Sequence, residues 1–104
     1  MPDNLIVKTP SAYSYPLLIK QLFLAPLVNN PDQEIVYRDQ VTITYQQWKE
    51  RVKRLASALT AIGVKRGDTV AVMEWDSHRY LEMYYAIPML GVVLHTINVR
   101  LSPE

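Results

Sequence analysis

Two short apolar segments in the second half of the chain constrain its fold more than any other feature. Residues 69–75 (TVAVMEW) and 92–97 (VVLHTI) each predict a β-strand that is apolar on both faces. The segment from Trp75 to Gly91 is long enough for a helical crossover between parallel strands. We therefore expect an α/β chain with a right-handed βαβ unit. Its sheet needs a layer on each side, and one crossover helix can cover only one of them.

The segment before these strands predicts a helix and a hairpin. Leucines recur over two turns in residues 16–28, which predicts a short helix that Pro16 begins and that Pro26 and Pro31 close. β-Branched and aromatic residues on both sides of Arg38-Asp39-Gln40 then predict a β-hairpin.

The local pattern after the hairpin predicts a long amphipathic helix over residues 45–62. Thr44-Tyr45-Gln46-Gln47 matches a capping box, and Gly63 lies where a left-handed residue ends a helix. The apolar face repeats at steps of four and three and consists of Trp48, Val52, Leu55, Leu59 and Ile62. The crossover helix is expected to be capped by Asp76 or Ser77, bent at Pro88 and ended by Gly91.

The expected elements form an unfinished sheet, so we interpret the chain as the front end of a larger architecture. Residues 1–15 contain prolines with Ser and Tyr between them and predict an extended arm. Residues 16–104 are expected to form the incomplete first part of a larger domain. The last residues, Leu101-Ser102-Pro103-Glu104, resemble the opening of a further helix.

Composition excludes several classes of function. The 104 residues include no cysteine, which rules out disulfides, thiolate catalysis and cysteine-based metal sites. A net charge of +1 gives no general case for binding nucleic acid. The longest apolar run, residues 86–94, is too short to span a bilayer, and the first residues lack the blocks of a signal peptide. We expect a cytoplasmic protein with no membrane span.

Few residues of the sequence suggest a catalytic or ligand-binding role. Glu74 and Asp76 flank Trp75 at the carboxyl end of a predicted parallel strand, where they could serve acid/base work or bind a cation. The alternative, which we favour, is that Asp76 caps the next helix and Glu74 lies at the surface. We expect His78 to be a surface residue near a helix start and His95 to be hydrogen-bonded at a sheet end. No catalytic, cofactor-binding or metal residue is predicted.

Two side-chain groups on the predicted helices also have alternative readings. Between Lys49 and Arg66 six basic residues accompany one acid, Glu50. A solvated outer face is favoured over a nucleic-acid or lipid contact, because aromatic residues are scarce there. Tyr84 and Tyr85 are adjacent on a predicted helix, so one of them faces away from the core, toward a partner or a neighbouring domain.

Several phrases resemble the N-terminal portion of the adenylate-forming enzymes, specifically the medium- and long-chain fatty-acyl-CoA synthetases. The resemblance covers residues 16–104 and includes PLLIKQLFLAPLVNNPDQEIVYRD, TYQQW with ALTAIGVKRGDTVAV, and AIPMLGVVLHTINVRLSPE. It implies an ATP-dependent ligase that converts a carboxylate to an acyl-adenylate and then to acyl-CoA, with ATP, Mg²⁺ and CoA used by the full-length enzyme.

The family's catalytic elements have no match in this chain. These are the phosphate loop ending in Pro-Lys, the adenine-contacting aromatic, the ribose-binding Asp and the C-terminal Lys. The chain's three glycines are far apart, which excludes a hidden phosphate loop. We therefore expect the chain to be inactive alone, with the remainder of the ligase or a second copy of the chain as its partner. The alternative is a stand-alone binding or oligomerisation module derived from such an enzyme.

Overall fold

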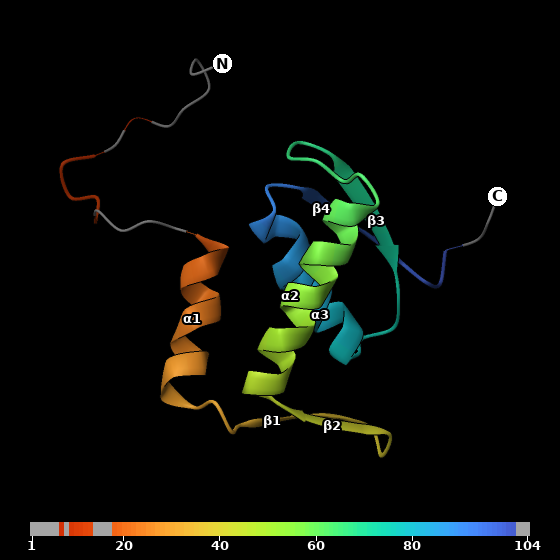
Figure 1. Ribbon diagram of the computed structural model, residues 1–104. Helices are drawn as coiled ribbons and strands as arrows, with labels where there is room; N and C mark the ends of the chain where they lie inside the picture. The colour runs from red at the N-terminus through yellow and green to blue at the C-terminus, as the bar shows by residue number, and fades with distance from the viewer. Residues whose placement is uncertain (1–6, 8, 14–17, 102–104) are drawn as a thin grey trace.

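A computed structural model describes residues 7, 9–13 and 18–101 and confirms the α/β class (Figure 1). Pro16 and most of the predicted arm at residues 1–15 lie outside these described residues. Within them the element order is α1 (Ile19–Asn29), β1 (Glu34–Tyr37), β2 (Val41–Thr44), α2 (Tyr45–Ala61), β3 (Thr69–Met73), α3 (His78–Met89) and β4 (Val93–Ile97).

Strands β3 and β4 are parallel and are joined by α3, as predicted. Their register runs from Thr69 opposite Val93 to Met73 opposite Ile97. Strand β3 is shorter than expected, because the chain leaves the sheet at Glu74. In the part of the chain that the structure describes, β3 and β4 form a two-stranded sheet, separate from the antiparallel β1–β2 pair.

The two faces of the β3–β4 sheet differ in how they are covered. Val70, Val72 and Leu94 pack into a cluster with α3 and with Leu59 from α2. Helices α2 and α3 lie on this side of the sheet (Figure 1). On the other side Met73 is 59% exposed and Val93 is 56% exposed. The helices of the described chain therefore cover one face and leave the other to solvent.

Helix α2 begins at the predicted capping box. The Thr44 hydroxyl accepts a hydrogen bond from the Gln47 backbone N–H at 3.1 Å, and the Thr44 N–H donates to the Gln47 side chain at 2.8 Å. Because each side chain satisfies the other residue's backbone N–H, two donors that the helix leaves free are paired. This local pairing fixes the junction between the hairpin and α2.

The end of α2 corrects the predicted apolar face. The backbone N–H of Gly63 donates to the carbonyl of Thr60, and that of Val64 to the carbonyl of Leu59, which is a Schellman motif. Gly63 adopts φ +100°, which a residue with a side chain rarely accepts. Ile62, expected on the apolar face, is 78% exposed. The prediction fails there because the helix has already ended, and Val64 packs near Leu59 instead.

Helix α3 is capped by Ser77 and not by Asp76. The Ser77 hydroxyl accepts from the Tyr80 backbone N–H at 3.4 Å. Pro88 lies inside the helix, one residue before its end. The helix ends in the same motif as α2, with Gly91 N–H donating to the Pro88 carbonyl and Val92 N–H to that of Ile87.

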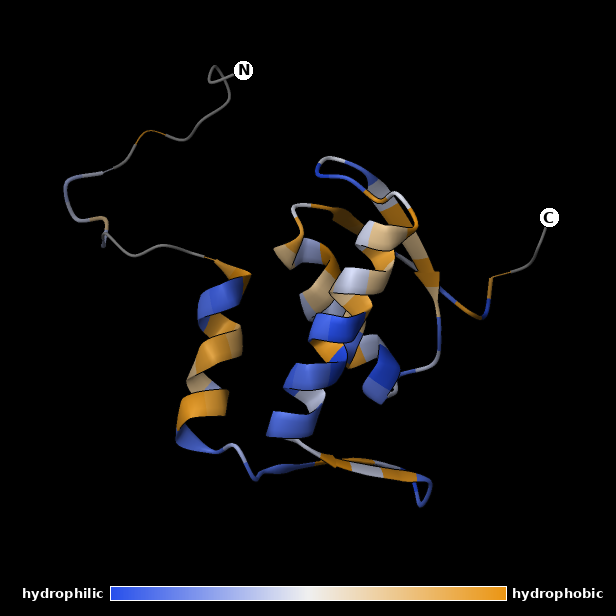
Figure 2. Ribbon diagram, viewed as in Figure 1, coloured by the Kyte–Doolittle hydropathy of each residue, from blue (hydrophilic) through white to orange (hydrophobic). Residues whose placement is uncertain are grey.

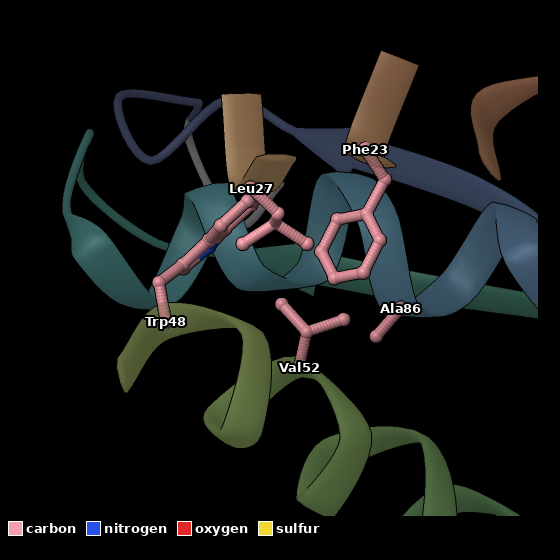
Figure 3. Packing of buried hydrophobic residues seen from close by; sticks show 5 residues of the cluster. All are labelled: Phe23, Leu27, Trp48, Val52 and Ala86. Carbon is pink, nitrogen blue, oxygen red and sulfur yellow. The ribbon is translucent and has the colours of Figure 1, made fainter. Parts of the chain in front are cut away.

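The main hydrophobic core lies between the three helices (Figure 3). Its buried side chains come from α1, α2 and α3 and point toward one another: Phe23, Leu27, Trp48, Val52 and Ala86. The Tyr85 ring meets Trp48 edge-on at 4.9 Å between centroids. The hairpin adds Ile35 and Ile43 to this cluster. The predicted hairpin is thereby confirmed and is packed against the helical layer.

Helix α1 begins at Ile19, later than the predicted residue 16, and ends at Asn29, next to the predicted end at residue 28. Pro26 lies inside the helix, which ends before Pro31. The helix tolerates the proline because Phe23 and Leu27, on either side of it, are buried in the core. Most of α1 is apolar (Figure 2), and Leu22 and Val28 are 64% and 78% exposed. An apolar helix with an uncovered side is typical of an element that packs on further structure.

Candidate functional site

A cleft of about 400 Å³ lies at the carboxyl ends of β3 and β4. This is the edge at which open parallel sheets bind ligands. Its walls come from the loop after β3, the segment after β4, and α3. The lining includes Glu74, Trp75, Asp76, Tyr80, Tyr84 and Arg100.

Aromatic rings form one side of this cleft. The rings of Tyr80 and Tyr84 are stacked, with centroids 4.9 Å apart and planes at 12°. Burial raises the pKa of Tyr80 above its ordinary value, and the adjacent Tyr84 adds to the shift. Tyr84 is 45% exposed, whereas Tyr85 packs in the core, so Tyr84 is the one of the pair that faces outward. The Arg100 guanidinium lies 5.9 Å from the centroid of the Trp75 ring.

The two carboxylates of the cleft are placed differently from the prediction. Glu74 is half-buried, and its Oε1 accepts a hydrogen bond from the Trp75 backbone N–H at 3.0 Å. Asp76 is exposed and does not cap α3. Within the described residues no group of three or more His, Asp or Glu side chains is placed to hold a metal ion. The cleft thus combines aromatic walls with the hydrogen-bond acceptors of Glu74 and Asp76. Among the described residues it brings together no acid/base pair.

His78 is buried, which corrects the expectation of a surface residue. Its side chain is 6% exposed, and its ring lies 5.7 Å from that of Tyr37 in β1. The hairpin folds over the start of α3, and no pattern within α3 itself signals that long-range contact. Burial lowers the pKa of His78, and the charge of Arg51 lowers it further.

His95 is also placed differently from its prediction. It lies in the middle of β4, opposite Ala71, and not at the end of the sheet. Its side chain is exposed. No hydrogen bond to the imidazole is found among the described residues. The two histidines therefore lie in opposite environments and do not converge on a common site.

An ion pair joins α2 to α3 and was not predicted. The Arg51 guanidinium donates to the Glu82 carboxylate, whose side chain is 7% exposed while that of Arg51 is 42% exposed. Arg51 belongs to the basic region between Lys49 and Arg66, for which a solvated outer face was predicted. The spacing of Arg51 between Trp48 and Leu55 could have revealed it, since that position borders the buried face of α2. Other basic residues of this region, such as Lys53 and Arg54, are exposed as predicted.

The glycines do not form a phosphate cradle. Gly63 and Gly91 end helices, and Gly67 lies in the turn before β3, where its N–H donates to the Gly91 carbonyl at 2.8 Å. Phosphate loops need several neighbouring glycines so that backbone N–H groups converge on the oxygens. The three glycines therefore do not form such a loop. No helix among the described residues is long and apolar enough to cross a membrane.

The fold and the cleft define a two-stranded parallel sheet that helices cover on one face, with a cleft at the carboxyl ends of its strands. The family model for AMP-binding enzymes matches residues 25–104, and the chain belongs to this family. The predicted resemblance to the N-terminal part of adenylate-forming enzymes is confirmed.

Relatives and a solved structure support this membership. A long-chain-fatty-acid–CoA ligase of Thermus thermophilus is 48% identical over 61 residues, which are 59% of this chain and 11% of that protein. A 3-methylmercaptopropionyl-CoA ligase of Ruegeria lacuscaerulensis is 39% identical over 93 residues, which are 86% of this chain and 17% of that protein. The structure of a Mycobacterium tuberculosis fatty acyl CoA synthetase has a TM-score of 0.72 and 30% identity, covering 82% of this chain and 17% of that one. The chain thus spans less than a fifth of the length of each of these proteins.

Proposed function

We propose that this chain is the N-terminal segment of an ATP-dependent fatty-acyl-CoA ligase. In that reaction a fatty-acid carboxylate attacks the α-phosphate of ATP, forming an acyl-adenylate and releasing pyrophosphate. The CoA thiolate then attacks the acyl carbon and releases AMP. The similarity to fatty-acid and other acid–CoA ligases across the described elements carries this proposal.

In this proposal the described residues act as a scaffold. ATP, Mg²⁺ and CoA would be held by parts of the ligase outside residues 1–104, and the chain would be inactive alone. The placement of all three glycines at turns supports this, because no phosphate cradle is left to the segment. Residues 1–15 are proposed to be an extended arm and residues 16–104 the beginning of the large domain.

The uncovered face of the β3–β4 sheet supports a larger domain. Parallel sheets occur almost only with both faces covered, since a two-sided apolar sheet in water exposes too much apolar surface. Here Met73 and Val93 are more than half exposed. We propose that the remainder of the ligase covers this face, and that the whole protein acts in the cytoplasm.

A second candidate is a stand-alone oligomerisation module without catalysis. The exposed apolar side chains of α1, including Leu22 and Val28, favour it, because a homodimer could cover them. Sedimentation velocity of the 104-residue chain separates the two candidates. A single, concentration-independent dimer supports the module, whereas indefinite association or a monomer that binds hydrophobic dye supports the ligase segment.

A chimeric enzyme tests the ligase proposal. The 61 residues of this chain that match the Thermus thermophilus long-chain-fatty-acid–CoA ligase would replace their counterparts in that enzyme, and AMP release would be measured with fatty acid, ATP and CoA. We expect activity within about tenfold of the parent, which corresponds to a barrier change of about 1.4 kcal/mol. The isolated 104-residue chain, assayed in parallel, should release none. A folded but inactive chimera, or turnover by the isolated chain, would contradict the proposal.

A further inference from the structure

His78 occupies a buried position between two elements far apart in the sequence. It is the first residue of α3, and its side chain is 6% exposed. Its Nδ1 atom is buried and has no hydrogen-bond partner among the described residues. Its ring contacts Tyr37, which belongs to β1. The imidazole therefore lies buried in the seam between the hairpin and α3.

The surroundings of this imidazole oppose a positive charge. The N-terminus of a helix carries a partial positive charge, which disfavours a cation at its first residue. The positive charge of Arg51 in α2 also acts against a cation on the ring, and this guanidinium is already paired with Glu82. The charged and titratable groups that act on the ring or contact it are Arg51, Glu82, Arg79, Glu74 and Tyr37, and the Arg38 guanidinium lies over the Tyr37 ring. Burial and Arg51 lower the pKa of His78, and the two carboxylates only partly compensate.

The hairpin is the element on which a charge at this seam would act. Each of its strands has four residues, and an isolated two-stranded hairpin is marginally stable in water. Its attachment depends on the apolar contacts of Ile35 and Ile43 with the core and on the Tyr37 contact with His78. Losing one of these attachments shifts the balance toward local opening, while the helical core stays packed.

We propose that His78 is a proton-sensitive latch, which holds the β1–β2 hairpin against α3 when neutral and releases it when protonated. Protonation would place a cation beside Arg51 without a partner for the buried Nδ1. Opening the hairpin exposes the imidazole to water and removes that cost. This inference is independent of the ligase proposal, because it concerns only contacts within the described chain.

The direction of the pH effect follows from linkage. The docked hairpin holds His78 at a lowered pKa, and the open hairpin restores the ordinary value of 6.5. The open state therefore binds the proton more tightly, so docking is fully stable above about pH 6.5 and weakens as the pH falls below it. Between about pH 7.5 and about pH 5.5 the opening equilibrium of the hairpin should rise by up to about tenfold.

Hydrogen exchange of the 104-residue chain tests the latch. Protection factors of the β1 and β2 amides would be followed by NMR between these two pH values, after correction for intrinsic exchange. We expect hairpin protection to fall by up to about tenfold while the amides of α3 and β4 change little. His78→Phe keeps a ring against Tyr37 but cannot be protonated, and it should abolish the response. His78→Gln provides a second uncharged variant, should His78→Phe disturb the packing.

His95→Gln is the matched control, because His95 is exposed and lies away from the hairpin. This variant should keep the full response. A hairpin response that persists in His78→Phe or His78→Gln, that disappears in His95→Gln, or that is shared equally by the core amides would overturn the proposal.

Discussion

The two faces of the β3–β4 sheet consist of the same two strands, but helices bury one face and leave the other exposed. Val70, Val72 and Leu94 face α2 and α3 and pack in a cluster with Ile87. Met73 and Val93 point to the opposite side and are more than half exposed. Burial of apolar area contributes about 25 cal/mol per Å². One face therefore contributes to the stability of this segment, whereas the other has apolar side chains that contribute little by themselves.

This difference shows which side of the sheet has its covering layer within the described residues. The helices finish one side of the sheet with ends fixed by local motifs, and the core between α1, α2 and α3 is closed. The opposite side has the composition of a buried strand surface without a cover. A segment of a larger ligase domain accounts for both observations, since its open face would be covered only in the whole protein.

The largest expected effect is on the covered face. Ile87 is 1% exposed and packs in the cluster beneath the sheet. Ile87→Ala removes apolar contacts and leaves a cavity, so the free energy of unfolding should fall by about 2–5 kcal/mol. Urea denaturation measures it, and a loss below about 1 kcal/mol would mean that this face is not the packed one.

An intermediate effect is expected at the edge of the covered face. Gly91 adopts φ +75°, and an added Cβ would lie 2.9 Å from Cγ of Arg66. Gly91→Ala should cost about 1–2 kcal/mol from the left-handed backbone, plus the displacement of the Arg66 side chain.

Gly63→Ala is the control for this position, because Gly63 also has positive φ but nothing lies within 4 Å of its added Cβ. Gly63→Ala should lower the free energy of unfolding only by the cost of placing a side chain at a left-handed backbone position. Thermal unfolding of both variants compares them. A Gly63→Ala loss larger than that of Gly91→Ala would mean that the Arg66 contact is not formed.

The smallest effect is expected on the open face. Val93→Thr and Met73→Gln replace side chains that are more than half exposed. Each should change the stability of the isolated chain by less than about 0.5 kcal/mol, as exposed positions usually do. In the chimeric ligase the same substitutions should be more costly, because the face would be covered there. Equal small effects in both settings would argue against a cover.

Local signals predicted much of the fold. The capping box at Thr44 and the glycine ends of α2 and α3 are short-range hydrogen-bonding motifs, so the residues that form them are adjacent in the sequence. The parallel β3–β4 pair followed from the apolar strands and the length of the crossover. The end of α1 at Asn29, shortly before Pro31, also lies next to the predicted end at residue 28.

The environment of the titratable residues was harder to predict. His78 is buried by the hairpin, and Glu82 is paired with Arg51 from another helix. These contacts join residues of different elements, and no spacing within α3 encodes them. The place of Glu74 and Asp76 after a parallel strand was predicted, because it follows from topology, but a helix cap and a surface residue were favoured there over a cleft. Its aromatic wall was not foreseen, because it requires the orientation of Tyr84 relative to Tyr80.

The most direct test of the central claim is the oxidation of methionine in the isolated chain by dilute peroxide. Met73 lies on the open face and is 59% exposed, whereas Met83 packs in the cluster under the covered face. Mass spectrometry of the peptides gives a rate for each residue. We predict that Met73 is oxidised several-fold faster than Met83 in dilute solution, where the chain is monomeric. Equal rates under these conditions would contradict an open sheet face and would mean that the chain covers that face by itself.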